Sequence, residues 1–161
     1  MIKKFLLSIV IVFAFVNLTK AQSFYDFTLE DLNGDDVTLS ELLKKGPVML
    51  SFWATWCAPC KDEMKYMNDI WAKYKDKGFT YLAVNNDNQK SLSKVRSFIS
   101  ANGYEFPVVL DTDEKIFEAY QGSGHPFSVI IGMDGSIKAR HLGYVPGDEV
   151  KFEEEIKANL N

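Results

Sequence analysis

The chain of 161 residues is poor in cysteine and histidine, with two of each. A tetrahedral zinc site built on the cysteines would need two further ligands, and beyond the carboxylates only His125 and His141 could supply them. One cysteine pair also excludes a fold held by several disulfides. The sequence has no internal repeat, no low-complexity stretch and no linker that would divide it. These absences predict a single domain with its own hydrophobic core.

Excess positive charge is also missing. The formal net charge is −4, and residues 1–21 contain three lysines and no acidic residue, so the chain without them carries −7. This balance argues against nucleic acid or an anionic membrane surface as a partner.

Residues 1–21 have the pattern of a secretory signal peptide, with Lys3 and Lys4, then the apolar run 5–18, then a small residue at Ala21. The apolar run is shorter than the ~20 residues that a membrane-spanning helix needs, which favours cleavage over an uncleaved anchor. No cysteine lies near the cut to carry a lipid anchor. We expect a signal peptide over residues 1–21 and one periplasmic or otherwise exported domain over residues 22–161, which would be membrane-anchored if the signal stays uncleaved.

The two cysteines lie three positions apart, in the segment Trp56-Cys57-Ala58-Pro59-Cys60. The apolar run 48–53 before this segment predicts a buried strand. Apolar residues at helical spacing follow it, at Met64, Met67, Ile70, Trp71 and Tyr74. Cys57 is therefore expected where a strand ends and a helix begins.

A cysteine at a helix N-terminus has a particular chemistry. The thiolate is the nucleophile, and the unpaired N–H groups and the positive end of the helix dipole favour an anion there. We therefore expect the pKa of Cys57 to fall below the ~8.5 of a free cysteine, and we expect Cys60, one turn into the helix, to be the shielded resolving thiol. Pro59 suits the first turn of a helix, and Trp56 is expected to pack beside the sulfurs. A purely structural bridge is disfavoured, because so short a loop gains little chain entropy.

Hydrophobic patterns predict the order of the elements. They indicate a β-hairpin over 24–39, a βαβ unit over 48–84, an extra αβα segment over 91–120, a second hairpin over 127–142 and a helix over 146–160. This order predicts a mixed sheet with helices on both faces. The cysteine pair would lie at the carboxyl end of a central strand, where open α/β sheets place their sites.

The segment 52–61 resembles the active-site segment of thioredoxin-fold proteins. With the hairpin, the αβ insert and the export signal, residues 22–161 are similar to the TlpA/ResA-like branch of exported thiol-disulfide oxidoreductases. The resemblance implies a thioredoxin-like three-layer α/β/α sandwich with a mixed central sheet, an N-terminal β-hairpin and an αβ insert. It also implies a protein-disulfide reductase that uses a Cys57/Cys60 dithiol–disulfide cycle and no cofactor.

The resemblance implies roles for further residues. Pro126 matches the cis-proline that faces the cysteines in this family, and the backbone of His125 would pair with a substrate chain in strand fashion. Glu63 matches a glutamate that approaches the cysteine pair and helps to move protons, whereas thioredoxin itself carries a buried acid at the position of Ser51. The alternatives are an ordinary trans proline and a solvated surface glutamate.

His125 departs from the family, in which Thr, Val or Ile is more common before the cis-proline. A protonated imidazole near Cys57 would favour the thiolate and make the disulfide more oxidising. The alternative is a histidine that points to solvent. His141, in the second hairpin, is expected to have no role.

An exported reductase would act as a monomer on disulfide-containing exported proteins such as apocytochromes. A membrane thiol-transfer protein would return electrons to it, because the compartment is oxidising.

Two other functions remain open. A peroxiredoxin-like peroxidase shares the fold, but it usually has a Thr-x-x-Cys setting, and here Cys57 takes the place of the threonine before Cys60. A copper(I) chaperone could bind through Cys57, Cys60 and His125, although such chaperones use a longer cysteine spacing.

Overall fold

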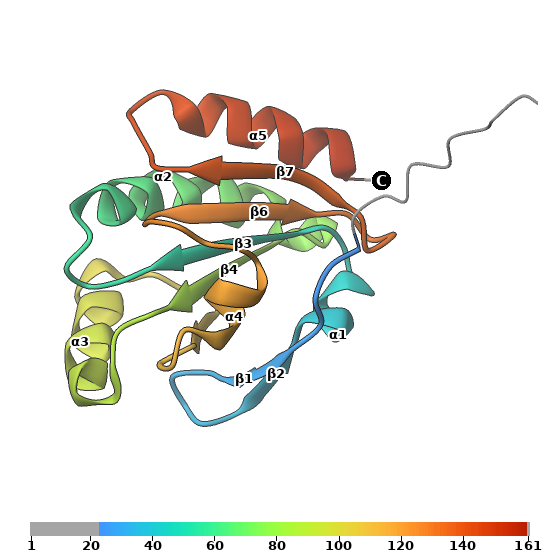
Figure 1. Cartoon of the computed structure of the whole chain (residues 1–161). Helices are drawn as coiled ribbons and strands as arrows, with labels where there is room; N and C mark the ends of the chain where they lie inside the picture. The colour runs from blue at the N-terminus through green and yellow to red at the C-terminus, as the bar shows by residue number, and fades with distance from the viewer. Residues whose placement is uncertain (1–22, 161) are drawn as a thin grey trace, which may run out of the picture.

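A five-stranded mixed sheet forms the centre of the protein, in the order β5-β4-β3-β6-β7 (Figure 1). The computed structural model describes residues 23–160, so the expected signal peptide lies outside the described residues. The strands are β3 (Val48–Trp53), β4 (Thr80–Asn85), β5 (Val108–Leu110), β6 (Phe127–Ile131) and β7 (Ile137–Leu142). β3, β4 and β5 run parallel, whereas β6 and β7 are antiparallel to their neighbours. The predicted mixed sheet is confirmed.

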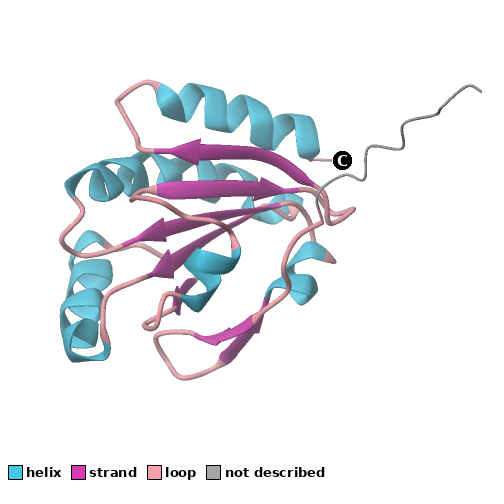
Figure 2. Cartoon of the chain, viewed as in Figure 1, coloured by secondary structure: helices cyan, strands magenta, loops and turns pink. Residues whose placement is uncertain are grey.

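Helices cover both faces of this sheet, as the predicted sandwich requires (Figure 2). One face packs against α2 (Ala58–Tyr74), α3 (Leu92–Asn102) and α5 (Asp148–Asn159), and the other against α1 (Leu39–Leu43) and α4 (Lys115–Ala119). Short 3-10 turns, η1 (Lys75–Lys77) and η2 (Gln89–Ser91), follow α2 and precede α3. Side chains of β3 alternate between the two cores, with Met49 on one face and Leu50 on the other, because successive residues of a strand point to opposite faces.

The N-terminal hairpin forms a separate two-stranded sheet of β1 (Thr28–Glu30) and β2 (Asp36–Thr38). Its turn contains Gly34 at a φ of +90°, and the Asp31 side chain accepts hydrogen bonds from the turn's main chain. The first strand was expected to begin at residue 24, but only the residues opposite β2 pair in the hairpin, and Phe24 instead donates its N–H to Gly135.

The helix of the αβ insert also begins later than its pattern predicts. A helix was expected from residue 111, but α4 starts at Lys115. The Asp111 carboxylate accepts hydrogen bonds from the main-chain N–H groups of Ile116 and Phe117, so this residue caps the helix from outside it. Within residues 23–160, none of the helices is both long and apolar enough to cross a membrane.

Candidate active site

The two cysteines form a disulfide at the carboxyl end of β3 and the start of α2. Cys57 is the N-cap of α2, and the main-chain N–H of Cys60 donates to the Cys57 Sγ at 3.2 Å. The two side chains are 4% and 1% exposed. The predicted strand-to-helix junction is confirmed. A helix N–H directed at the Cys57 sulfur would stabilise a thiolate once the pair is reduced.

Trp56 and Pro59 flank the disulfide in different ways. Pro59 lies in the first turn of α2, where its missing N–H breaks no helical hydrogen bond. The Trp56 side chain is 68% exposed, and its ring lies edge-on to His125 with centroids 5.3 Å apart. Trp56 therefore presents an exposed apolar surface next to Cys57.

The peptide bond between His125 and Pro126 is cis. The prediction of a cis-proline is confirmed, and the trans alternative is wrong. Phe127, the first residue of β6, pairs with Phe52 on β3. This register places Pro126 and His125 at the same end of the sheet as the loop that leads to Cys57.

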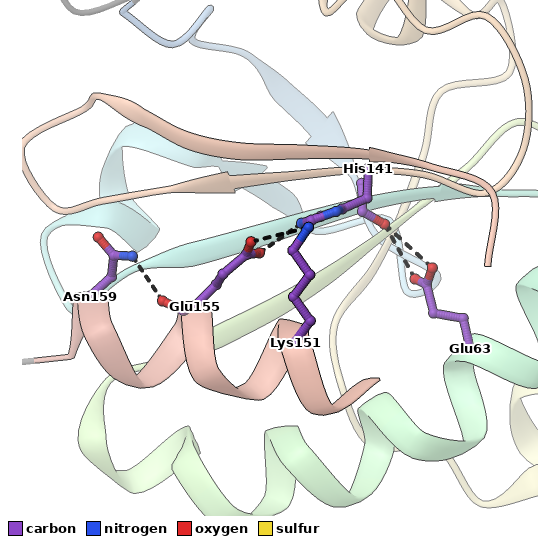
Figure 3. A network of polar contacts seen from close by, with 6 residues as sticks. Glu63, His141, Lys151, Glu155 and Asn159 are labelled. Carbon is purple, nitrogen blue, oxygen red and sulfur yellow. Dashed lines mark hydrogen bonds and ion pairs between the residues drawn. The ribbon is translucent and has the colours of Figure 1, made fainter. Parts of the chain in front are cut away.

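The carboxylate of Glu63 is buried below the disulfide end of the sheet. It accepts hydrogen bonds from the Ser51 hydroxyl on β3 at 2.6 Å and from the Tyr81 hydroxyl on β4 at 3.2 Å. Figure 3 shows Glu63 extending from α2 toward the strands. With 1% of the residue exposed, the surface-glutamate alternative is wrong. Burial raises the pKa of this carboxyl to about 7, although its hydrogen bonds act in the opposite direction.

Ser128 on β6 completes the surroundings of Glu63, with its hydroxyl 3.4 and 3.5 Å from the two carboxylate oxygens. Ser51 and Ser128 are paired across β3 and β6. The Glu63 carboxylate thus reaches from the helix to the strand position of Ser51.

His125 is held between an aromatic ring and an amide. Its imidazole stacks on Phe117 of α4, with centroids 4.7 Å apart and planes at 13°, and its Nε2 lies 3.1 Å from the Oδ1 of Asn86. Burial lowers the pKa of the imidazole, against the opposite effect of the carboxylates of Glu114 and Asp87. Burial therefore favours the neutral form of His125 over the protonated imidazole that would promote the Cys57 thiolate.

A buried polar cluster at the end of β4 was missed by the sequence reasoning. The Asp87 carboxylate accepts hydrogen bonds from the Thr55 N–H at 2.7 Å, the Thr55 hydroxyl at 2.7 Å and the Asn85 amide at 2.9 Å. The Asn86 amide donates to Asp111 at the end of β5. These contacts tie the loop before Cys57 to the strands beside it.

A signal for this cluster was present in the sequence. The polar run 85–88 follows a predicted apolar strand, and Asp111 follows the next strand. The carboxyl ends of parallel strands meet at one edge of a sheet, so these residues belong beside the cysteines. Asn86, Asp87 and Asn88 line a cleft of about 350 Å³ together with Trp56, residues 112–114 and Glu118 of α4.

His141 lies in a different environment. Its Nε2 is 2.7 Å from the Oε2 of Glu155, in the space between β7 and α5 (Figure 3). Across residues 23–160, no group of three or more His, Cys, Asp or Glu side chains is arranged to hold a metal ion.

Comparison with known proteins identifies the family of this chain. The sequence matches the AhpC/TSA family over residues 21–140. The chain belongs to the AhpC/TSA family. This family member is 42% identical to the thiol-disulfide oxidoreductase ResA of Bacillus subtilis over 112 residues, which are 70% of the chain and 61% of that protein. It is 38% identical to ResA of Halalkalibacterium halodurans over 133 residues, 82% of the chain and 74% of that protein. It is also 38% identical to ResA of Bacillus thuringiensis over 118 residues, which are 73% of the chain. The matched part spans 66% of the length of that relative.

Solved structures agree with these relatives. A Chlorobium tepidum structure described as the thiol:disulfide interchange protein DsbE superposes with a TM-score of 0.80 at 34% identity, covering 88% of this chain and 97% of that one. The thioredoxin domain of a Bacteroides vulgatus thiol-disulfide oxidoreductase gives a TM-score of 0.73 at 26% identity, covering 88% and 97%. The thioredoxin-like fold and the ResA-like resemblance of this AhpC/TSA-family chain are confirmed.

Proposed function

We propose that this chain is a thiol-disulfide oxidoreductase that reduces the disulfides of exported proteins. Cys57 is the nucleophile and Cys60 the resolving thiol. The observation that carries the proposal is the disulfide at the start of α2, with the Cys60 N–H directed at the Cys57 sulfur. The names of its ResA relatives support the same chemistry.

The reaction transfers two electrons from the dithiol to the substrate. The Cys57 thiolate attacks one sulfur of a substrate disulfide, which forms a mixed disulfide and releases one substrate thiolate. The Cys60 thiolate then attacks the Cys57 sulfur, so the second substrate thiolate leaves and the Cys57–Cys60 disulfide forms. Two protons lost by the cysteines are regained by the two substrate sulfurs.

Glu63 is proposed to exchange the proton of Cys60. A buried carboxyl with a pKa of about 7 is close to the ideal for proton transfer near neutral pH. Glu63 lies one turn after Cys60 on α2, and residues three apart on a helix are neighbours. The hydroxyl groups around Glu63 can accept or donate, so the carboxyl can change charge in place.

The substrate is proposed to bind as an extended polypeptide beside cis-Pro126. Within residues 23–160 the main-chain N–H and C=O of His125 make no hydrogen bond to the protein, so both are available to pair with a substrate strand. The exposed Trp56 ring, which lies against His125, and the exposed Pro59 offer apolar contact next to the cysteines.

The signal-like pattern of residues 1–21 supports an exported location. The substrates would be exported proteins with disulfides, apocytochromes among them, and a membrane thiol-transfer protein would return electrons to the chain. We propose that the chain acts as a monomer in this cycle.

Insulin reduction with dithiothreitol as the electron source tests the proposal. Cys57→Ser should lose essentially all turnover, while Cys60→Ser should accumulate a mixed disulfide with the substrate, because the resolving thiol is missing. Ala58→Ser is the matched control, since it adds a hydroxyl at an exposed position between the cysteines and should retain activity. Wild-type turnover by Cys57→Ser would disprove the mechanism, and faster consumption of peroxide than of insulin disulfides would favour a peroxidase.

A further inference from the structure

The orientation of the Asn86 side chain is fixed by its partners. Asn86 is buried, and its Nδ2 donates to the main-chain oxygen and to the carboxylate Oδ2 of Asp111, each at 3.1 Å. Both partners are acceptors, so they require the NH₂ group of the amide. The carbonyl Oδ1 must therefore be the atom that faces His125 Nε2 at 3.1 Å.

This orientation fixes the proton on His125. An amide carbonyl can only accept a hydrogen bond, so Nε2 must carry hydrogen. In the neutral ring, which burial favours, Nδ1 then holds a lone pair, and Nδ1 has no hydrogen-bond partner among residues 23–160. Stacking on Phe117 fixes the plane of the ring, and Trp56, adjacent to Cys57, lies at its edge.

We propose that Asn86 is a positioning residue, which holds His125 in its neutral Nε2–H tautomer beside Trp56, at the end of the sheet that carries the disulfide. The ring then carries a lone pair on Nδ1, and not a positive charge, next to the cis-proline where the substrate is proposed to bind. This inference rests on the proposed thiol-disulfide function for its consequence, but the state of His125 can be measured without that activity.

The charged groups near His125 show why an amide matters here. The carboxylates of Asp87 and Glu114 both favour the imidazolium form, and Asp111 lies directly behind Asn86. A carboxylate at Nε2 would add a third favourable charge and promote protonation. An amide carbonyl accepts the Nε2–H hydrogen bond without adding a negative charge. The neutral imidazole is therefore favoured even though several carboxylates surround it.

Two substitutions separate positioning from simple structural support. Asn86→Ala and Asn86→Asp both remove the amide donors to Asp111, but only Asn86→Ala also removes the acceptor for His125. A structural role predicts the same effect on His125 from both variants, whereas a positioning role predicts that only Asn86→Ala loses the Nε2–H tautomer. Asn88→Asp is the charge control, because Asn88 is exposed and bonds to Lys90 and Ser91, not to His125.

Nitrogen-detected NMR of the histidine rings gives the direct readout. The chain has only two histidines, so a His141→Asn variant assigns the signals. The wild type should show the Nε2–H tautomer at neutral pH, and Asn86→Ala should show a mixture of tautomers. Asn86→Asp should keep Nε2–H and raise the His125 pKa by about 1–3 units. In the reduced protein, ultraviolet absorbance of the thiolate should show a lower Cys57 pKa in Asn86→Asp and no change in Asn88→Asp.

A wild-type His125 protonated on Nδ1 would overturn the proposal, as would identical His125 spectra and titrations in the two Asn86 variants. If Asn86→Ala does not fold, the tautomer of the wild type and the titration of His125 in Asn86→Asp still test the positioning role of Asn86. The expected tautomer in a protein that fails to reduce insulin would reject the proposed function and leave the positioning role of Asn86 intact.

Discussion

Two buried carboxylates lie near the disulfide, and their surroundings differ. Glu63 enters from α2 and meets three hydroxyl groups, those of Ser51, Tyr81 and Ser128. Asp87, at the end of β4, meets the main-chain N–H and hydroxyl of Thr55 and the amide of Asn85. Hydroxyls can rotate and either donate or accept, whereas N–H groups can only donate. The first environment suits an acid that exchanges protons, and the second suits an acid that anchors a loop.

Glu63→Gln tests the proton-exchanging role of the first carboxylate and should have the largest effect on activity. Glutamine fills the same space but cannot exchange a proton, so resolution of the mixed disulfide should slow by about 10²-fold. Single-turnover release of substrate from the Cys57 adduct measures this step. Unchanged resolution in Glu63→Gln would remove Glu63 from the mechanism.

The same substitution should change how stability depends on pH. The pKa of Glu63 is raised from 4.5 to about 7 in the folded protein, so the stability gained by binding its proton is fully present below pH 4.5 and lost as the pH rises to 7. This single group contributes about 3 kcal/mol across that window. Urea unfolding of the oxidised protein measures the free energy of unfolding of both proteins. The value for Glu63→Gln minus the value for the wild type should rise by that amount between pH 4.5 and 7 and stay constant above pH 7. A constant difference throughout would mean that folding does not raise the pKa of Glu63.

Asp87→Ala tests the loop-anchoring role of the second carboxylate. It leaves the Thr55 N–H, the Thr55 hydroxyl and the Asn85 amide without their acceptor, so we expect a loss of about 3 kcal/mol in the free energy of unfolding. Thr55→Ala removes only the hydroxyl hydrogen bond and should lose about 1 kcal/mol. Both values come from denaturant unfolding at pH 7. Equal losses in the two variants would show that the hydrogen bonds to Asp87 from the Thr55 main chain and from the Asn85 amide contribute nothing.

The sequence predicted the parts of the site that depend on neighbouring residues. An apolar run followed by helical spacing located Cys57 at a strand-to-helix junction, and both patterns are local. The cis bond at Pro126 and the place of Glu63 were predicted only through family resemblance, since no local pattern indicates either one. The contacts that link Asp87 to Thr55 and Asn86 to Asp111 and His125 join residues 25 to 39 positions apart, so they depend on which strands are neighbours in the sheet. A polar run after a strand indicated the edge of the sheet but not the partners.

The two serines around Glu63 allow the finest test of the comparison. Ser51 and Ser128 are paired across adjacent strands, yet Ser51 lies 2.6 Å from the carboxylate and Ser128 at least 3.4 Å. Both hydrogen bonds lower the pKa of Glu63, and the one from Ser51 is the stronger. Ser51→Ala should therefore move the pKa of Glu63 above 7 by more than Ser128→Ala does.

Carbon-detected NMR titration of the Glu63 carboxyl in the oxidised protein measures both shifts, with Glu63→Gln assigning the signal. The order matters because a hydroxyl at 2.6 Å stabilises the ionised form far more than one at the limit of hydrogen-bond distance. A larger shift in Ser128→Ala would place the charge of Glu63 nearer β6 than β3. The carboxyl would then lie away from the strand position at which thioredoxin carries its own buried acid.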